Sequence, residues 1–298
     1  MKRRKTGRRQ RRFRISPRIW APVAATALLL TACGGGSTVT ASPPAVRSAP
    51  QVPYTDSISF FVETQVQTGE AADESGTVLA SYTYQLPVMT ALRKDGTAVS
   101  PENAKIEREK QALATAKAFN EEFQRWAEEA DFASLAEAAG QGARRPGGQV
   151  PYAQDLECEI YQTDRLVSVA GQFYVSSGGA HPNTGLYGWN FDLASGRFFS
   201  VGELFDDVDA VTRELVRKST QRAAKDGLSP EQFFWKDYAE ILAAWSESAV
   251  AVTFDGENMT VSYSPYDLAA YAAGPQIFTI PLEWLEPYLS AYGKSLLA

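Results

Sequence analysis

Apolar and polar positions alternate with period two at the start of the folded region. Residues 57–67 follow this pattern, with Ile58, Phe60 and Val62 on one face, and residues 77–88 repeat it after a polar stretch. Alternation of this kind is typical of half-buried strands. We predict two antiparallel strands, the second of which ends at Leu86-Pro87 because proline cannot donate to a sheet ladder.

A helical period follows. Apolar residues recur at steps of three, four and seven between Ile106 and Trp126, which predicts one helix over residues 101–129, capped by Ser100 with Pro101 at its first position. The opposite face is rich in glutamate and is expected to be solvated; a docking surface for a basic partner is the alternative. Residues 139–148 predict a flexible joint or a hairpin tip.

The second half of the chain has strands, then helices, then strands. Strands are predicted over 152–161, 166–176 and 186–193, and a tight turn at 194–196 leads to a short return strand. Helices are predicted after the capping box of Ser200 and Glu203, after Asp206-Asp207, and from Ser229-Pro230 through Trp245. A hairpin over 250–263, a strand over 277–280 and a helical turn around Trp284 complete the pattern.

This order of elements predicts an α+β fold with mostly antiparallel sheets and packed helices. Two subdomains are expected behind a lipoprotein signal and a flexible tether. The expected bounds are 1–32 for the signal peptide, 33–53 for a lipidated Cys33 and its tether, 54–148 for an N-terminal α+β subdomain, and 149–298 for a C-terminal α+β domain.

The N-terminus has the pattern of a bacterial export signal. Ten basic residues within the first 18 positions precede an apolar run of about 14 residues, which is too short to span a membrane. The run ends in Leu30-Thr31-Ala32-Cys33, which resembles the lipobox of bacterial lipoproteins. That resemblance implies cleavage before Cys33 and attachment of a lipid to its thiol. An ordinary signal peptide is the alternative, and the arginine pair at 11–12 leaves the export route open.

The net charge of the chain limits the kinds of partner that it can bind. The chain has 29 Lys and Arg, ten of which lie in the signal, so 19 basic residues face 35 acidic residues after residue 32, a net charge of −16. A surface this acidic repels nucleic acid and favours cationic partners. No nucleic-acid partner is therefore expected.

The candidate chemistry gathers in a glycine-rich loop and in a tyrosine-rich segment. The loop holds His181, the only histidine, and the segment 263–275 holds three tyrosines and Gly274-Pro275. Core packing is one interpretation of the tyrosines, and a binding surface shared with the loop is the other. The candidate ligand-binding residues are Gly178, Gly179, His181, Asn183, Tyr187, Tyr266 and Tyr271.

A lone histidine beside Pro182 in a glycine-rich loop is also typical of a structural hydrogen-bonding residue. Catalysis is a further alternative for His181, as a base beside Ser176 or Ser177 with Asp192 as its orienting group. The serines lack the G-x-S-x-G signature, so no catalytic residue is predicted. A metal site would need further His or Cys ligands, and phosphate-binding loops are absent, so neither a metal nor a cofactor is expected. Cys158 alternates with Leu156 and Ile160 and is expected to face the core.

Three stretches resemble one family. They are SGGAHPNTG at 177–185, FDLASGRFFSVGELF at 191–205 and YSPYDLAAYAAGP at 263–275. Together they are similar to the extracytoplasmic domain of unknown function of RsiV-type anti-sigma factors, which also occurs in PdaC-type peptidoglycan deacetylases. The resemblance covers about 150–298, while residues 54–130 share only the layout of a companion domain.

The resemblance implies an envelope-facing binding module, and in RsiV-type proteins this domain binds lysozyme. The chain shows neither a cytoplasmic sigma-binding segment nor a deacetylase domain, so neither activity is expected. We therefore expect a non-catalytic binding or sensing lipoprotein, anchored by its lipid to the extracytoplasmic face of the membrane, with lysozyme or a cell-wall glycan as its ligand. The alternatives are a cell-wall hydrolase that uses carboxylates and an envelope scaffold without a ligand.

Overall fold

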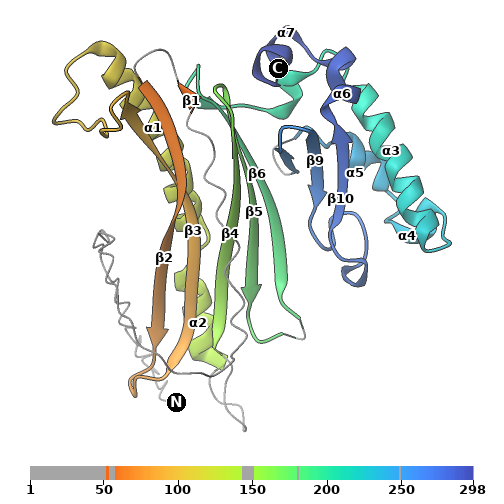
Figure 1. The fold of residues 1–298 in the computed structure, drawn as a ribbon. Coiled ribbons are helices and arrows are strands. Elements are labelled where there is room, and N and C mark those ends of the chain that lie inside the picture. The colour runs from red at the N-terminus through yellow and green to blue at the C-terminus, as the bar shows by residue number, and fades with distance from the viewer. Residues whose placement is uncertain (1–51, 54–57, 143–150, 180, 248–249, 298) are drawn as a thin grey trace, which may run out of the picture.

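A computed structural model describes residues 52–53, 58–142, 151–179, 181–247 and 250–297. The expected signal peptide, Cys33 and the tether as far as residue 51 lie outside the described residues. The described part has an α+β fold with two sheets and packed helices, which confirms the predicted fold class (Figure 1).

The larger sheet has seven strands that neighbour one another in chain order. All neighbouring pairs are antiparallel except β3 and β4, which run parallel over Ala80–Tyr84 and Tyr152–Leu156. The strands are β1 (Val52–Pro53), β2 (Ile58–Ala72), β3 (Val78–Arg93), β4 (Tyr152–Gln162), β5 (Leu166–Ser176), β6 (Asn183–Asp192) and β7 (Arg197–Phe198).

Two helices fill the connection that the parallel pair requires. α1 (Glu107–Glu129) and α2 (Phe132–Gly142) follow β3, and α1 buries its predicted apolar face, including Phe119, Phe123 and Trp126, against the sheet. α2 was not predicted, since no element was expected between residue 129 and the joint or hairpin tip expected over 139–148. The helix continues through the alanines and glycines of this stretch, with Leu135, Ala136 and Ala139 buried.

The larger sheet and one core cluster include residues from both expected subdomains. β3 and β4 lie on either side of the expected boundary at residues 148 and 149, yet they pair directly. The same core cluster contains Phe60 and Phe119 from before the boundary and Leu156 and Phe191 from after it.

The prediction that β3 ends at Pro87 is wrong, because the strand continues to Arg93. β4 pairs with β3 only as far as Tyr84, so this edge of β3 has no strand beside it at Pro87, and a missing N–H loses no ladder bond there. Two residues later, Asn120 of α1 takes the place of a strand. Its carboxamide accepts a hydrogen bond from Met89 N at 2.7 Å and donates one to Met89 O at 3.0 Å.

The prediction that α1 begins at Ser100-Pro101 is also wrong. Ser100 N donates to the Asn103 side chain at 2.8 Å, which makes a turn instead of a helix cap. Arg93 holds the following loop by donating to Asn103 and to Glu109 at 2.8 and 2.6 Å. Glu109 in turn accepts from the backbone of Lys105 at 2.7 Å, so the helix begins only at Glu107.

This carboxylate should make the stability of the fold depend on pH. The Arg93 guanidinium and the Lys105 N–H lower the pKa of Glu109 from 4.5 to about 2. The stabilisation is complete above pH 4.5 and is lost as the pH falls toward 2. We expect Glu109→Gln to lower the urea midpoint at pH 7, and the difference from the unmodified chain to shrink below pH 4.5.

The matched control for this prediction is Glu107→Gln, because Glu107 is exposed and forms only an exposed ion pair with Lys110. Its urea midpoint should stay close to that of the unmodified chain at both ends of the pH range. A Glu109→Gln effect that persists undiminished at pH 2 would contradict the assignment.

A second, three-stranded sheet and its helices form the C-terminal part, with strand order β10-β9-β8. The strands are β8 (Ala251–Phe254), β9 (Asn258–Tyr263) and β10 (Gln276–Pro281). The helices are η1 (Val201–Leu204), α3 (Val208–Lys225), α4 (Pro230–Phe233), α5 (Tyr238–Ala243), η2 (Tyr271–Ala273), α6 (Leu282–Leu285), η3 (Glu286–Tyr288) and α7 (Ala291–Leu297).

Local signals placed most of these elements correctly. Glu203 accepts from Ser200 N at 2.9 Å, and Asp207 caps α3 by accepting from Ala210 N at 2.9 Å. The helix predicted from Ser229 through Trp245 is instead divided into α4 and α5. It is interrupted because Trp235 N donates to Leu268 O at 3.1 Å, a bond to a distant segment.

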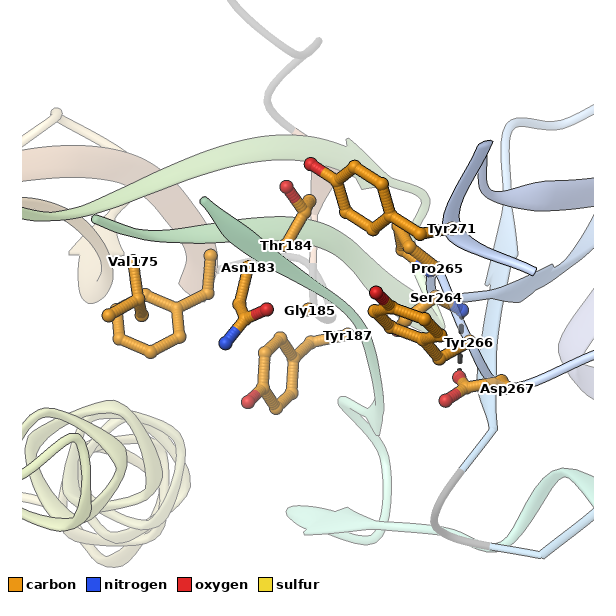
Figure 2. Close-up of a pocket in the computed structure, with 11 residues that line it drawn as sticks. Val175, Asn183, Thr184, Gly185, Tyr187, Ser264, Pro265, Tyr266, Asp267 and Tyr271 are labelled. Carbon is orange, nitrogen blue, oxygen red and sulfur yellow. Dashed lines mark hydrogen bonds between the residues drawn. The ribbon is translucent and has the colours of Figure 1, made fainter. Parts of the chain in front are cut away.

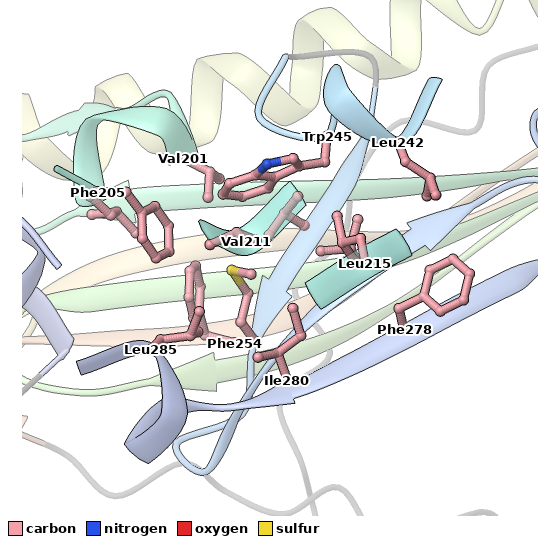
Figure 3. Packing of buried hydrophobic residues seen from close by; sticks show 14 of the residues in the cluster. Val201, Phe205, Val211, Leu215, Leu242, Trp245, Phe254, Phe278, Ile280 and Leu285 are labelled. Atoms are coloured by element: carbon pink, nitrogen blue, oxygen red, sulfur yellow. The ribbon is translucent and has the colours of Figure 1, made fainter. Parts of the chain in front are cut away.

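The core of the C-terminal part lies between the small sheet and its helices. Figure 3 shows Leu215 of α3 and Trp245 packed with Phe254 and Ile280 of the small sheet. Leu166 of β5 belongs to the same cluster, so this core extends onto the larger sheet.

Two buried hydrogen bonds join β8 to the larger sheet, and a third links the two side chains that make them. The Ser168 hydroxyl donates to the Asn190 side-chain oxygen at 2.8 Å and accepts from Phe254 N at 2.9 Å, while the Asn190 side-chain nitrogen donates to Val252 O at 2.8 Å. Gly188 lies so close to β8 that a Cβ there would be 2.4 Å from Val252 O. The contact therefore requires glycine.

We expect Gly188→Ala to lower the free energy of unfolding by about 2–3 kcal/mol, because the added methyl group meets backbone atoms that cannot rotate away. Chemical denaturation measures this loss. Gly179→Ala is the control, since a Cβ there meets nothing closer than 3.6 Å. Equal effects of the two substitutions would show that the close contact between the sheets is absent.

Candidate functional site

The β5–β6 turn carries the predicted glycine loop. Gly178 has φ +74°, and a Cβ there would be 2.8 Å from the Tyr152 ring, so both conformation and space favour glycine. Gly179 is exposed, and the loop presents His181 at the surface. The loop therefore displays the histidine beside a segment more than 80 residues away in sequence.

That segment is the predicted tyrosine-rich stretch. The His181 and Tyr271 rings stack with centroids 3.8 Å apart at an angle of 18°, and the Tyr266 hydroxyl lies 3.3 Å from His181 Nε2. The Tyr271 hydroxyl donates to Pro182 O at 3.0 Å. The structure thus brings the two candidate stretches together.

A surface pocket of about 400 Å3 lies where they meet, and we call it the tyrosine groove (Figure 2). Four predicted residues line it, while Gly178, Gly179 and His181 lie beside it in the loop. The lining residues are Phe173, Val175, Asn183, Thr184, Gly185, Tyr187, Ser264, Pro265, Tyr266, Asp267 and Tyr271.

Sequence reasoning missed several of these residues. Phe173 pairs with Gly185 across β5 and β6, and a Cβ at Gly185 would lie only 3.1 Å from the Tyr187 ring. Glycine in a strand was the available signal, because it often marks a close approach or a ligand site. Ser264 and Asp267 carried no local signal.

Ser264 fastens the two walls of the groove. Its hydroxyl accepts a hydrogen bond from Leu186 N of β6 at 3.0 Å. Its own N–H donates to the Asp267 carboxylate at 2.8 Å. Ser264 therefore holds the tyrosine-rich segment against the edge of the larger sheet.

Tyr266 has a strained backbone and an exposed side chain. Its φ of +76° lies in the left-handed region, which a residue with a Cβ adopts at a cost, and it is 52% exposed. The Trp235 indole N–H donates to Tyr266 O at 2.8 Å and helps to hold this conformation. Strain of this kind is concentrated at functional sites.

The strain predicts an inverted order of stability for two substitutions that both remove the ring. Alanine is normally more stable than glycine, but at Tyr266 the Cβ of alanine keeps the left-handed penalty. We expect Tyr266→Gly to be more stable than Tyr266→Ala by about 1 kcal/mol in chemical denaturation. The usual order, with alanine more stable, would contradict the strained conformation.

The groove has little charge. Asp267 is the one charged residue among the described lining residues, and the remaining polar groups are hydroxyls and the Asn183 carboxamide. Partial burial raises the pKa of the Tyr187 hydroxyl above its usual value of 10, so it is a neutral donor at physiological pH. The groove can therefore offer aromatic faces together with neutral hydrogen-bonding groups.

The catalytic alternative for His181 is not assembled. Asp192 lies at the opposite end of β6 from the loop, roughly 30 Å away along the strand. It accepts hydrogen bonds from Ala194 N, the Ser195 hydroxyl and the Tyr292 hydroxyl at 2.9, 2.8 and 3.2 Å. Asp192 therefore joins the β6–β7 turn to α7 and does not orient His181.

Cys158 packs against the core of the larger sheet, as predicted, and burial raises the pKa of its thiol to about 12. Within the described ranges, no group of three His, Cys, Asp or Glu side chains could hold a metal ion. No helix in the described part of the chain is long and apolar enough to cross a membrane.

Comparison with known families adds one match, which covers the C-terminal part. Residues 198–283 match the family described as "Protein of unknown function (DUF3298)". The chain carries a DUF3298 domain. The matched residues include the segment 263–271 with Tyr266, whereas the glycine loop and Tyr187 precede the match. The tyrosine groove is therefore formed by residues within the DUF3298 match and by residues before it.

Two solved structures resemble the chain. A DUF3298 family member from Bacteroides fragilis is 16% identical, with 78% of this chain and 94% of that chain covered and a TM-score of 0.48. A DUF3298 family protein from Pseudomonas aeruginosa is 18% identical, with 77% and 94% covered and a TM-score of 0.39. Among curated proteins no match is found.

Proposed function

We propose that the chain is a non-catalytic binding module of the cell envelope, which takes its ligand in the tyrosine groove. The observation that carries this proposal is the strained, exposed Tyr266 at a pocket shared by two distant segments. A left-handed tyrosine costs folding free energy, and an exposed ring contributes little to a core. A role in ligand binding accounts for a tyrosine that costs folding free energy and does not stabilise the core.

The dimensions and composition of the groove support this use. Ligand sites commonly measure about 300–1,000 Å3 and combine aromatic side chains with a few polar groups. The tyrosine groove has about 400 Å3, three tyrosines and the Asn183 carboxamide. Tyrosine is also enriched where binding energy is concentrated.

The N-terminal pattern supports a place of action at the membrane surface. A basic stretch, a short apolar run and the sequence ending in Cys33 support export and attachment of a lipid to this cysteine. We propose that the lipid holds the module at the extracytoplasmic face of the membrane, with residues 34–53 as a tether. Residues from Gly34 to Pro53 are rich in Gly, Ser, Thr and Pro, which suits a linker.

The proposed ligands are lysozyme or a glycan of the cell wall. The net charge of −16 after residue 32 favours a cationic protein such as lysozyme and disfavours nucleic acid. Steering by such a surface accelerates association and weakens with salt. A neutral glycan would instead use the aromatic rings of the groove, and its binding would change little with salt.

Binding measured by calorimetry tests the proposal. We expect the full-length chain, purified in detergent, to bind a c-type lysozyme or soluble peptidoglycan fragments. Tyr266→Ala should weaken that binding about tenfold, because a central tyrosine of a binding site is worth more than 1 kcal/mol. The measurement at low and high salt distinguishes the two ligands.

The control is Ile277→Ala, since Ile277 is 54% exposed, much as Tyr266 is, but lies on β10 and does not line the groove. It should leave the affinity unchanged. If neither ligand binds at either salt concentration, or if binding is indifferent to Tyr266→Ala, the proposed function is wrong.

A further inference from the structure

The exposed aromatic surface continues beyond the tyrosine groove. Trp235, at the break between α4 and α5, is 41% exposed, and its indole N–H lies 2.8 Å from the carbonyl oxygen of Tyr266. Its backbone N–H donates to Leu268 O at 3.1 Å, so the residue is fixed to the tyrosine-rich segment. Trp235 therefore lies next to Tyr266 but is not part of the pocket lining.

A second exposed ring, that of Tyr187, belongs to the groove lining itself. Tyr187 of β6 is 37% exposed and is supported from behind by Trp189, whose ring stacks with it at 5.3 Å and 11°. Trp126 of α1 packs edge-on to Tyr187 at 5.8 Å. Tyr187, Tyr266 and Trp235 are thus exposed rings, and the contacts behind Tyr187 and the backbone bonds of Trp235 hold two of them in position.

The chemistry of the lining selects a class of ligand. No lysine or arginine is among the described residues that line the groove, so it offers no partner for a phosphate or an anionic polymer. Its polar groups are hydroxyls, one carboxamide and the carboxylate of Asp267. Such groups suit the hydroxyls of a neutral sugar, while the apolar face of a pyranose ring suits contact with an aromatic ring.

We infer that the site takes a neutral oligosaccharide that runs from Tyr187 across Tyr266 to Trp235, with Trp235 as an outer subsite. This inference rests on the proposed function, because it assumes that the tyrosine groove is the ligand site. Tyr187 and Tyr266 contact the sugars held in the groove. Trp235 contacts the next part of the chain, so only longer oligosaccharides reach it.

A length series tests the inference. The full-length chain is titrated by calorimetry with chito-oligosaccharides and cello-oligosaccharides, from disaccharide to hexasaccharide. We expect the affinity to rise with length. Compared with Trp235→Phe, which loses the same hydrogen bond to Tyr266 O, Trp235→Ala should weaken hexasaccharide binding about tenfold and leave disaccharide binding unchanged, whereas Tyr266→Ala should weaken both.

Two further variants separate stacking from support of the backbone. Trp235→Phe keeps an aromatic face but loses the hydrogen bond to Tyr266 O, so it should retain most of the hexasaccharide affinity if stacking is the cause. Ile277→Ala, exposed but not part of the groove lining, should match the unmodified chain at every length. Circular dichroism of each variant establishes that it is folded.

The outcomes distinguish this inference from the function on which it rests. If folded protein binds neither sugar series, yet still binds lysozyme in a way that Tyr266→Ala weakens, the inference is overturned and the proposed function stands. If Trp235→Ala weakens disaccharide and hexasaccharide equally, Trp235 only positions Tyr266, and the outer subsite is overturned. If binding of every ligand is indifferent to Tyr266→Ala, both fail.

Discussion

The contact between β8 and the larger sheet is the constraint on which the rest of the molecule depends. β8 is an edge strand of the small sheet, and the unpaired backbone groups of an edge strand are normally covered by another part of the protein. Ser168 and Asn190 provide it by bonding to the backbone of Phe254 and Val252. Because these side chains are buried, breaking one bond would leave a polar group without a partner in an apolar setting. The absence of a side chain at Gly188 lets the backbones approach closely enough for the bonds to form.

The tyrosine groove is a consequence of this junction. Once the small sheet is held against β5 and β6, the segment after β9 lies beside the β5–β6 turn, and the bond from Leu186 N to Ser264 fixes it there. One wall of the groove therefore belongs to β5 and β6 of the larger sheet, and the other wall is the segment that follows β9. Tyr266 can keep its left-handed conformation because Trp235 and the His181 loop surround it with specific contacts.

Part of the candidate site could be predicted from residue types alone. The glycine-rich loop with the only histidine and the tyrosine-rich segment indicated Gly178, His181, Tyr266 and Tyr271 as candidates. The involvement of Phe173, Ser264 and Asp267 could not be predicted. Their contribution depends on which strands are neighbours and on which backbone group each side chain meets, and neither is encoded by a local pattern. Trp235 was predicted as part of a continuous helix and is instead a surface ring beside Tyr266.

The sequence by itself determined the α+β class, most strand positions and the caps at Ser200 and Asp207, because each of these follows from burial or hydrogen bonding within a few residues. Only the tertiary structure decided that β3 continues through Pro87, that α1 begins at Glu107, and that one sheet joins the two expected subdomains. The reason is the same in each case. The deciding hydrogen bonds, such as those from Asn120 to Met89 and from Arg93 to Asn103 and Glu109, connect separate elements, and their free energy outweighs local preference.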